Sequence, residues 1–280
     1  MNKYFLILIV FVFLIFCLFP KNIEGFYNHK ICGRSNLNRI ALWKNVKNKY
    51  GIKIADWIFP RSYLLPDDMS ALLQDKNKHF ILKRKWASLR NGVDLYDNKI
   101  DIAKNQNHYD IAQVFIKNPY LINGFKFDIR IFMAVDCSMG VYVYKKGYNV
   151  YTKKPYKYDT LDRECKINMA YAPDNHYDEN GLPRTTDEMR LPDKVWYILG
   201  KKLGYILSAC DRLCCGEDRG YGNVYGMDVE LLENMEPKII EINSTPSMNF
   251  TEQWKIDFLA KMKQDVRRKN FTSNDWMRIR

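Results

Sequence analysis

The sequence predicts an α+β fold built on antiparallel sheets, and three observations support this class. Short apolar runs with alternating side chains occur at residues 127–136 and 224–248, and the second is interrupted by a turn, as in a β-hairpin. Helical spacing of apolar residues marks residues 37–50 and 193–216. Strands and helices do not alternate with the regular beat of a doubly wound parallel sheet. We therefore expect antiparallel sheets with helices packed on them.

Composition and charge are those of a folded, basic protein. The chain has 280 residues, 47% hydrophobic and 14% aromatic, enough for one composite domain or two small lobes. Its formal net charge of +12 suits an acidic protein, an anionic membrane or nucleic acid as partner. The lysines are scattered and no nucleic-acid-binding motif accompanies them, so no nucleic acid is expected. Seven cysteines at irregular spacing argue against a zinc site.

The amino-terminal residues predict a membrane anchor. Residues 4–19 form an unbroken apolar run, and a helix of this length covers roughly 24 Å of a hydrocarbon core of about 30 Å. No small-residue cleavage pattern follows, so we expect an uncleaved anchor at residues 1–21, with a secretory signal peptide as the alternative. More positive charges follow the run than precede it, which places the folded part in the cytosol. Residues 22–36 are polar and are interpreted as a linker.

The first folded elements are expected to be a helix and a buried strand. Residues 37–50 have the spacing of a short amphipathic helix. A strand at residues 79–83 leads into a basic loop that ends at Gly92. A longer strand at residues 127–136 alternates, so that Asp128 and Arg130 share the face opposite the apolar side chains. Those two side chains either pair with each other or bind a ligand.

The second half of the chain is expected to contain a return strand, an irregular segment and two helices. A strand at residues 141–144 should turn back at residues 145–147. Residues 151–192 have no periodicity, and Asp193 is then expected as the N-cap of a helix that Gly216 closes. Residues 253–268 read as a basic terminal helix, followed by a tail at residues 269–280.

A hairpin between these two helices is the most informative part of the sequence. Two apolar runs flank a turn at residues 231–237, and pairing about its midpoint would place Asp228 across from Glu241. Asn243 shares the face of Glu241, since side chains alternate along a strand. Two carboxylates and an amide oxygen are suitable ligands for Mg²⁺, with water and phosphate completing its shell. For Asp228 alone, a chance surface acid is the favoured interpretation; for the three residues together we predict a metal site.

The same residues carry a family resemblance. The strings GMD at 226–228 and IIEINSTPSM at 239–248 resemble the last conserved block of the tubulin–tyrosine ligase-like family, a branch of the ATP-grasp ligases. WIFPRSYLLP at 57–66 is similar to the family's entry segment, and FILK at 80–83 to its first ATP-lysine strand. QVFIKNPYLINGFKFDIRIFMAV, from Gln113 onward, is similar to its hinge and following strand. These segments cover about residues 50–260 in the family's order and imply an ATP-grasp-type fold over residues 37–268.

The resemblance implies a nucleotide site. Lys83, at the end of its strand, corresponds to the family's lysine for the ATP phosphates. Gln113, Phe115 and Ile116 lie in the hinge that holds adenine. The loop keeps one glycine of the family's two, and Arg90 stands one position from the family's arginine.

The resemblance also implies the catalytic residues. The K-F-D-R string assigns Lys126 to the phosphates, Asp128 to the nucleotide and Arg130 to the incoming carboxyl group. Asn168 matches the asparagine of the family's H-L-T-N block. Val150 stands where the family has an arginine, for which a nearby lysine would have to substitute.

Two functions follow as expectations. The first is an ATP- and Mg²⁺-dependent ligase that joins a free amino acid, glutamate above all, to a carboxylate of an acidic protein or peptide such as a tubulin tail. Its basic surface would attract that acidic acceptor. The alternative is a membrane-tethered, catalytically silent module of the same fold that binds an acidic partner.

Overall fold

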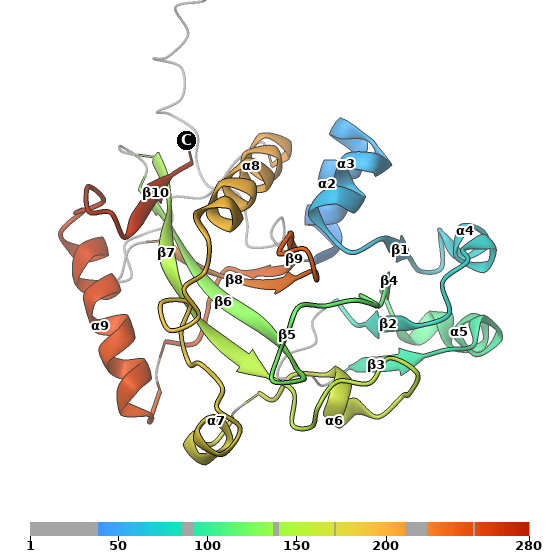
Figure 1. Cartoon of the computed structure of the whole chain (residues 1–280). Helices are drawn as coiled ribbons and strands as arrows, with labels where there is room; N and C mark the ends of the chain where they lie inside the picture. The colour runs from blue at the N-terminus through green and yellow to red at the C-terminus, as the bar shows by residue number, and fades with distance from the viewer. Residues whose placement is uncertain are drawn as a thin grey trace, which may run out of the picture. The chain divides into compact units, whose positions relative to one another are not determined.

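The computed structural model describes residues 39–85, 92–136, 140–170, 172–210, 223–248 and 250–279. They form an α+β fold with two antiparallel sheets, as expected from the sequence (Figure 1). The elements, in chain order, are α2 (Arg39–Tyr50), α3 (Ile52–Ile58), β1 (Ser62–Leu64), α4 (Met69–Gln74), β2 (Phe80–Lys83), β3 (Val93–Tyr96), α5 (Lys99–Asn105), the 3₁₀ turn η3 (Gln106–His108), β4 (Ile111–Val114), β5 (Leu121–Ile122), β6 (Phe125–Asp136), β7 (Gly140–Tyr151), α6 (Arg163–Lys166), α7 (Asp174–Glu179), α8 (Asp193–Ala209), β8 (Asn223–Leu231), β9 (Pro237–Asn243), α9 (Gln253–Arg267) and β10 (Trp276–Arg278).

The expected anchor and linker, residues 1–36, lie outside the described residues. Within the described part, no helix has the length and apolar character needed to cross a membrane.

The smaller sheet has the strand order β1-β4-β2-β3, and helices cover one of its faces. Phe80 and Leu82 of β2 point to that face and pack with Leu72 of α4 and Ile102 of α5. Successive side chains of a strand alternate, so Lys83 of β2 points to the opposite face, toward the larger sheet.

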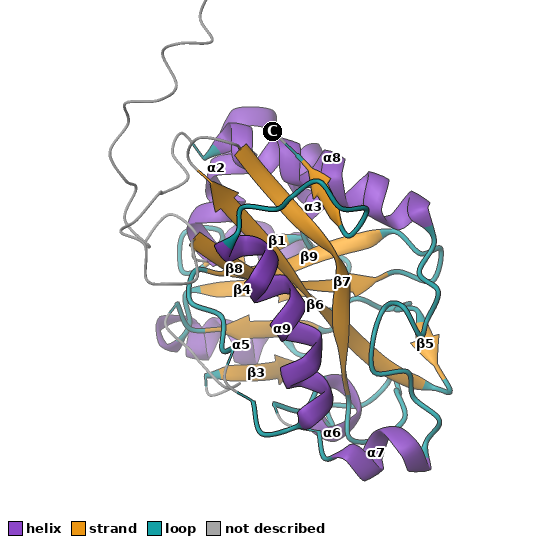
Figure 2. Ribbon diagram, turned by 90° about the vertical axis from the view of Figure 1, so that its left-hand side faces the viewer, coloured by secondary structure: helices purple, strands orange, loops and turns teal. Residues whose placement is uncertain are grey.

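The larger sheet has the order β10-β7-β6-β8-β9, with β5 paired to β6. The odd-numbered apolar residues of β6, expected to share a face, lie in the core formed with α2, α3 and α8. On the other face, Phe132 and Ala134 pack with residues of α9 (Figure 2). Lys126, Asp128 and Arg130 continue that second face beyond the part that α9 covers, so the sheet offers a polar surface beside an apolar one.

The β8–β9 hairpin forms as the sequence predicts, with one irregularity. Asp228 pairs with Glu241, and the turn lies between Leu231 and Pro237. The register shifts by one residue between Asp228 and Val229, which leaves Ile240 as the extra residue of a β-bulge. Because of this bulge, Ile240 and Glu241 both face the polar side of the sheet, while the flanking Ile239 and Ile242 lie in the core.

The expected turn at residues 145–147 is wrong. Strand β7 continues through it from Gly140 to Tyr151, and the register against β6 shifts between Ile131 and Met133 instead. Gly147 permits this irregularity, since a Cβ there would lie 2.7 Å from the side chain of Ile129 and 2.9 Å from the carbonyl oxygen of Arg130. The extra residues are thus absorbed within a long strand.

The helices after the irregular segment lie close to their predicted positions. Helix α8 begins at Asp193, with Pro192 rather than Asp193 at the N-cap, and ends at Ala209. Its predicted end, Gly216, lies outside the described residues. Helix α9 agrees with the predicted residues 253–268. The segment expected as a tail contributes β10, which pairs antiparallel with β7.

A buried lysine on α8 connects three segments that are distant in the sequence. Lys202 Nζ donates to the carbonyl oxygens of Trp57 and Pro237, both at 2.6 Å, and to Glu236 Oε1 at 2.8 Å. Lys238 Nζ also donates to the Trp57 carbonyl, at 3.0 Å. These bonds fasten the end of α3 to α8 and to the turn of the β8–β9 hairpin.

Candidate active site

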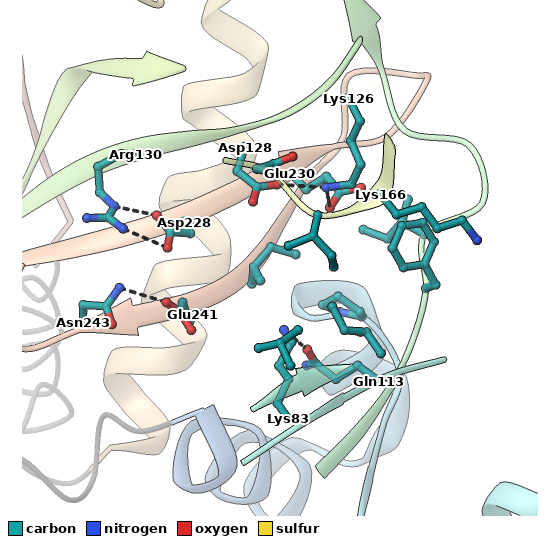
Figure 3. Close-up of a pocket in the computed structure, with 18 of the residues that line it drawn as sticks. Lys83, Gln113, Lys126, Asp128, Arg130, Lys166, Asp228, Glu230, Glu241 and Asn243 are labelled. Carbon is teal, nitrogen blue, oxygen red and sulfur yellow. Dashed lines mark hydrogen bonds and ion pairs between the residues drawn. The ribbon is translucent and has the colours of Figure 1, made fainter. Parts of the chain in front are cut away.

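A cavity of about 360 Å³ lies between the two sheets. Every predicted site residue that the structure describes lines it, and the predicted Arg90 lies outside the described residues. The predicted residues brought together are Lys83, Gln113, Phe115, Ile116, Lys126, Asp128, Arg130, Asn168, Asp228, Glu241 and Asn243. Figure 3 shows Lys83 and Gln113 on the smaller sheet, across the cavity from the charged side chains of the larger one.

One end of the cavity is apolar. Its apolar lining comes from both sheets and from the segment after α6, and includes Ile81, Val93, Phe115, Ile116 and Ile167. Phe115 stacks against Tyr156 with the ring planes 7° apart, and the Tyr156 hydroxyl donates to the carbonyl oxygen of Ile116 at 3.1 Å. Such a wall, with backbone polar groups at its edge, suits a flat heteroaromatic ring.

Lys83 is held in place by a buried hydrogen-bonded chain. Its Nζ donates to Gln113 Oε1 at 2.5 Å, and Gln113 Nε2 donates to Ser62 Oγ at 3.0 Å. Lys83 and Gln113 are 5% and 2% exposed. This chain fixes an ammonium group on the cavity wall, where it can bind an anion.

A second cationic group on β6 sits between two carboxylates. Lys126 Nζ lies 2.9 Å from Glu230 Oε2 and 3.4 Å from Asp128 Oδ1. Burial lowers the pKa of a lysine, but the carboxylates of Asp128 and Glu230 more than reverse this, so the pKa of Lys126 is raised. Burial likewise raises the pKa of Glu230, to about 7. Sequence reasoning missed Glu230, although strand alternation places it on the face of Asp228, two residues away.

Arg130 pairs with Asp228 on the neighbouring strand, and Asp128 pairs with Lys126, so the two residues expected to share a face take different partners (Figure 3). The Arg130 guanidinium makes two hydrogen bonds to Asp228, from Nε to Oδ1 at 2.5 Å and from Nη2 to Oδ2 at 3.0 Å. Burial raises the pKa of Asp228 to about 6, against the opposing effect of Arg130. Burial outweighs the arginine, so the carboxyl group of Asp228 is a weaker acid than that of a free aspartate.

The donor set beside Arg130 fits Mg²⁺. Asp228 and Glu241 pair across the hairpin, and Asn243 Nδ2 donates to Glu241 Oε1 at 3.1 Å. Arg130 occupies one lone pair on each oxygen of Asp228, and each oxygen has two, so this carboxylate can still bind a cation. Among the described residues, no three His, Cys, Asp or Glu side chains are placed to hold a metal ion by themselves. Asn243 and ligand oxygens would therefore have to complete the shell.

Lys166 of α6 and Asn168, which follows it, add polar groups to the cavity lining. Both side-chain atoms of Asn168, Oδ1 and Nδ2, are buried and have no hydrogen-bond partner among the described residues. Such orphaned atoms are costly unless a ligand or water satisfies them, so Asn168 fits a ligand-binding role. Lys166, which sequence reasoning missed, is 1% exposed and lies 4.8 Å from the centre of the Phe115 ring.

The glycine of the GMD string has a packing role. A Cβ on Gly226 would lie 2.7 Å from Pro246 Cβ and 3.3 Å from Arg130 Cδ. Only a residue without a side chain lets the segment after β9 close over β8 at this point. Gly226 of the first string thus lies directly beneath Pro246 of the second.

Comparisons with known proteins agree with the family resemblance. The profile of the tubulin-tyrosine ligase family matches residues 22–196 and 214–275. A probable tubulin polyglutamylase, ttll-9 of Caenorhabditis elegans, is 22% identical over 240 residues, which cover 75% of this chain and 58% of that protein. Tubulin polyglutamylase TTLL13 of Mus musculus is 26% identical over 257 residues, covering 79% of this chain and 30% of that protein. A probable beta-tubulin polyglutamylase of Tetrahymena thermophila is 23% identical over 246 residues, covering 76% of this chain and 20% of that protein.

The chain spans 58% or less of the length of these three relatives. Its two antiparallel sheets around a charged cavity are consistent with an ATP-grasp-like fold. The family profile covers well over half of the chain. The chain therefore belongs to the tubulin-tyrosine ligase family.

Proposed function

We propose that this chain is an ATP- and Mg²⁺-dependent ligase that joins the amine of glutamate to a carboxylate of an acidic protein segment, such as a tubulin tail. Family membership supports the reaction class, and the names of the relatives support glutamate and tubulin. The observation that carries the proposal is the layout of the cavity. An apolar wall, two buried lysines and a carboxylate–amide set lie in one space, in the arrangement that a base, a polyphosphate and a divalent cation require.

The reaction needs positioning and charge neutralisation more than a protein nucleophile. The γ-phosphoryl group of ATP moves to the acceptor carboxylate, which gives ADP and an acyl phosphate. The neutral amine of the incoming amino acid then attacks the acyl carbon, so that an amide forms and phosphate leaves. The amine must have lost one proton before the attack and loses a second afterwards.

Six of the cavity residues have a role in that scheme. Lys83 and Lys126 bind the phosphates as fixed cations. Arg130 uses two of its five N–H donors on Asp228, which leaves the others for the carboxyl group of the incoming amino acid. Mg²⁺, held by Asp228, Glu241 and Asn243, would neutralise charge on the β- and γ-phosphates.

The acceptor is proposed from charge. The net charge of +12 favours an acidic segment as partner, and long-range attraction of this kind weakens as salt rises. Activity toward a glutamate-rich peptide should therefore fall with ionic strength more steeply than activity toward a peptide with fewer carboxylates.

The experiment is an intact-mass assay of acidic peptides, including tubulin tails. Purified protein without residues 1–21 is incubated with ATP, Mg²⁺ and one amino acid at a time, and the peptides are weighed. We expect the mass of one or more glutamate residues to be added, with ADP and phosphate released, and neither to occur with the Glu241→Gln variant. Folded protein that binds ATP but adds no mass to any acidic peptide would contradict ligase activity.

That negative outcome would favour the alternative function, a catalytically silent module that binds an acidic partner. One observation supports it. The nearby Lys153 and Lys154, which would have to substitute for the family arginine that the resemblance places at Val150, both pair with Glu164 and do not line the cavity.

Membrane attachment through residues 4–19 is a separate proposal that rests on sequence alone. We expect the full-length chain to remain uncleaved and to be extracted from membranes by detergent but not by salt or alkali. A mature amino terminus beyond Pro20 would instead indicate a secretory signal peptide.

A further inference from the structure

One buried carboxylate in the cavity has an oxygen that the protein itself does not use. Glu230 is 5% exposed, and its Oε2 pairs with Lys126 at 2.9 Å. Its other oxygen, Oε1, is buried and has no hydrogen-bond partner among the described residues. A buried acceptor without a donor is costly, so a ligand that supplies a donor would bind favourably here.

Glu230 stands between the two ends of the cavity. It is two residues from Asp228 on the same face of β8, which places it roughly 7 Å along the strand from the metal set. On its other side lies the apolar wall: Figure 3 shows Glu230 between Asp228 and Lys166, and Lys166 Nζ lies 4.8 Å from the centre of the Phe115 ring. The residue therefore faces the middle of a ligand that reaches from the apolar wall to the metal set.

The chemistry of a carboxylate limits which chemical group of the ligand can lie beside Glu230. An ionised carboxylate only accepts hydrogen bonds, and Glu230 together with Asp128 outnumbers the single lysine between them. A phosphate oxygen next to Oε1 would be repelled, because Lys126 pairs with Oε2 and Oε1 has no hydrogen-bond donor among the described residues. The neutral donors of ATP are the amino group of its base and the 2′- and 3′-hydroxyls of its ribose, and only the ribose lies between the base and the phosphates.

We propose that Glu230 determines nucleotide specificity in this chain by accepting a hydrogen bond from a ribose hydroxyl of ATP through Oε1. The inference rests on the proposed ATP site and adds to it a residue that reads the sugar. Carboxylates bind ribose hydroxyls in dinucleotide-binding proteins for the same reason, because a diol offers donors that a buried carboxylate needs. Lys126 orients the group by holding Oε2.

The experiment compares the binding of ATP, 2′-deoxy-ATP, 3′-deoxy-ATP and inosine triphosphate by calorimetry with Mg²⁺ and no acceptor. We expect the wild-type protein to bind ATP about tenfold more tightly than at least one of the deoxynucleotides, the effect of one hydrogen bond to a charged group. In Glu230→Leu, which removes the acceptor, that ratio should fall to within about twofold of unity. Glu230→Gln keeps the shape of the side chain and is the variant to use if Glu230→Leu fails to fold. It should also reduce the ratio.

Glu241→Gln is the matched control, since it changes a carboxylate at the metal end of the same hairpin. It should weaken the binding of all four nucleotides by a similar factor and leave the ratio of ATP to deoxynucleotide unchanged. Equal affinity of the wild-type protein for ATP and both deoxynucleotides would overturn the inference. So would an unchanged ratio in the Glu230 variants, or a change in discrimination against inosine triphosphate alone, which would place the contact on the base.

Failure of the inference can be told from failure of the proposed function. If the protein binds ATP in a Mg²⁺-dependent manner but does not discriminate against deoxynucleotides through Glu230, the site assignment stands and the role of Glu230 is wrong. If folded protein binds no nucleotide at all, both are wrong.

Discussion

Arg130 of β6 donates two parallel hydrogen bonds to Asp228 of the neighbouring strand β8. The pair joins the string that contains Lys126, Asp128 and Arg130 to the hairpin 98 residues further along the chain. Asp228 is also a proposed metal ligand, so one carboxylate is shared between a fixed guanidinium and a cation. The pair therefore has both a structural and a chemical part in the site.

The structural part predicts a large cost for losing the arginine. In Arg130→Met, Asp228 is left as a mostly buried carboxylate without its partner, and breaking such a pair costs about 3–5 kcal/mol. Both side chains are nearly one-fifth exposed, at 19% and 17%, which favours the lower end of that range. Urea unfolding measures this change. A double variant, Arg130→Met with Asp228→Leu, should recover part of the loss; a single-variant cost below about 1 kcal/mol would contradict the assignment.

The proposed metal set predicts that a change at Glu241 weakens Mg²⁺-dependent nucleotide binding without changing stability. Glu241→Gln keeps the shape but removes one charge from the metal set, so affinity for the Mg²⁺–nucleotide complex should fall at least about tenfold. The free energy of unfolding without Mg²⁺ should change little. Calorimetric titrations with and without Mg²⁺ measure the difference. Glu233→Gln, at the exposed tip of the same hairpin, is the control and should bind as the wild type does; equal behaviour of the two variants would remove Glu241 from the metal set.

Gly226 predicts a steric effect close to the cavity. In Gly226→Ala the new methyl group would lie 2.7 Å from Pro246 Cβ, and overpacking of this kind costs about 1–3 kcal/mol. The displaced segment should also weaken nucleotide binding. Gly204→Ala is a matched control, because a Cβ there meets nothing within 4 Å and the residue lies inside α8. In thermal unfolding, Gly204→Ala should raise the free energy of unfolding by about 0.5–1 kcal/mol. A similar rise for Gly226→Ala would show that the segment after β9 can move aside.

Lys202 predicts a pH dependence of stability. Burial lowers its pKa to about 8 in the folded protein, against about 10.4 for a free lysine. Between these values the folded state has released a proton that the unfolded state still holds, so stability rises with pH in that window. The free energy of unfolding should rise by up to about 3 kcal/mol across this window. In Lys202→Met, urea unfolding should show a smaller rise from pH 8 to 10 than in the wild type; identical slopes would mean that the lysine stays charged.

Much of the hairpin and of β6 followed from alternation and turn chemistry alone. The pairing of Asp228 with Glu241 was predicted from the midpoint of the turn and is confirmed. The bulge at Ile240 was not predicted, because a single extra residue leaves no mark on a short apolar run. The turn expected at residues 145–147 was wrong for a related reason, since a Gly-containing irregularity inside a long strand has the composition of a turn.

The partners of charged residues were the least predictable part of the site. Asp128 and Arg130 lie on one face, but Arg130 pairs with Asp228 on the neighbouring strand, and Asp128 pairs with Lys126, two positions away on its own strand. Glu230 escaped attention because the family strings supplied the other residues, and its importance follows from a buried oxygen that only coordinates reveal. Packing across strands therefore decided what the linear pattern left open.

The bonds of Lys202 and Lys238 to the Trp57 carbonyl also bear on the order in which the chain can fold. Lys238, the later of the two lysines, follows Trp57 by 181 positions, so at about 5–20 residues per second the ribosome needs roughly 10–35 s to complete the bonds that fasten α3. Until then, the apolar faces of α2 and α3 have no β8–β9 hairpin to cover them. Nascent chains that end before β8 should therefore leave Trp57 open to a fluorescence quencher and should be bound by chaperones, whereas chains extended past β9 should not.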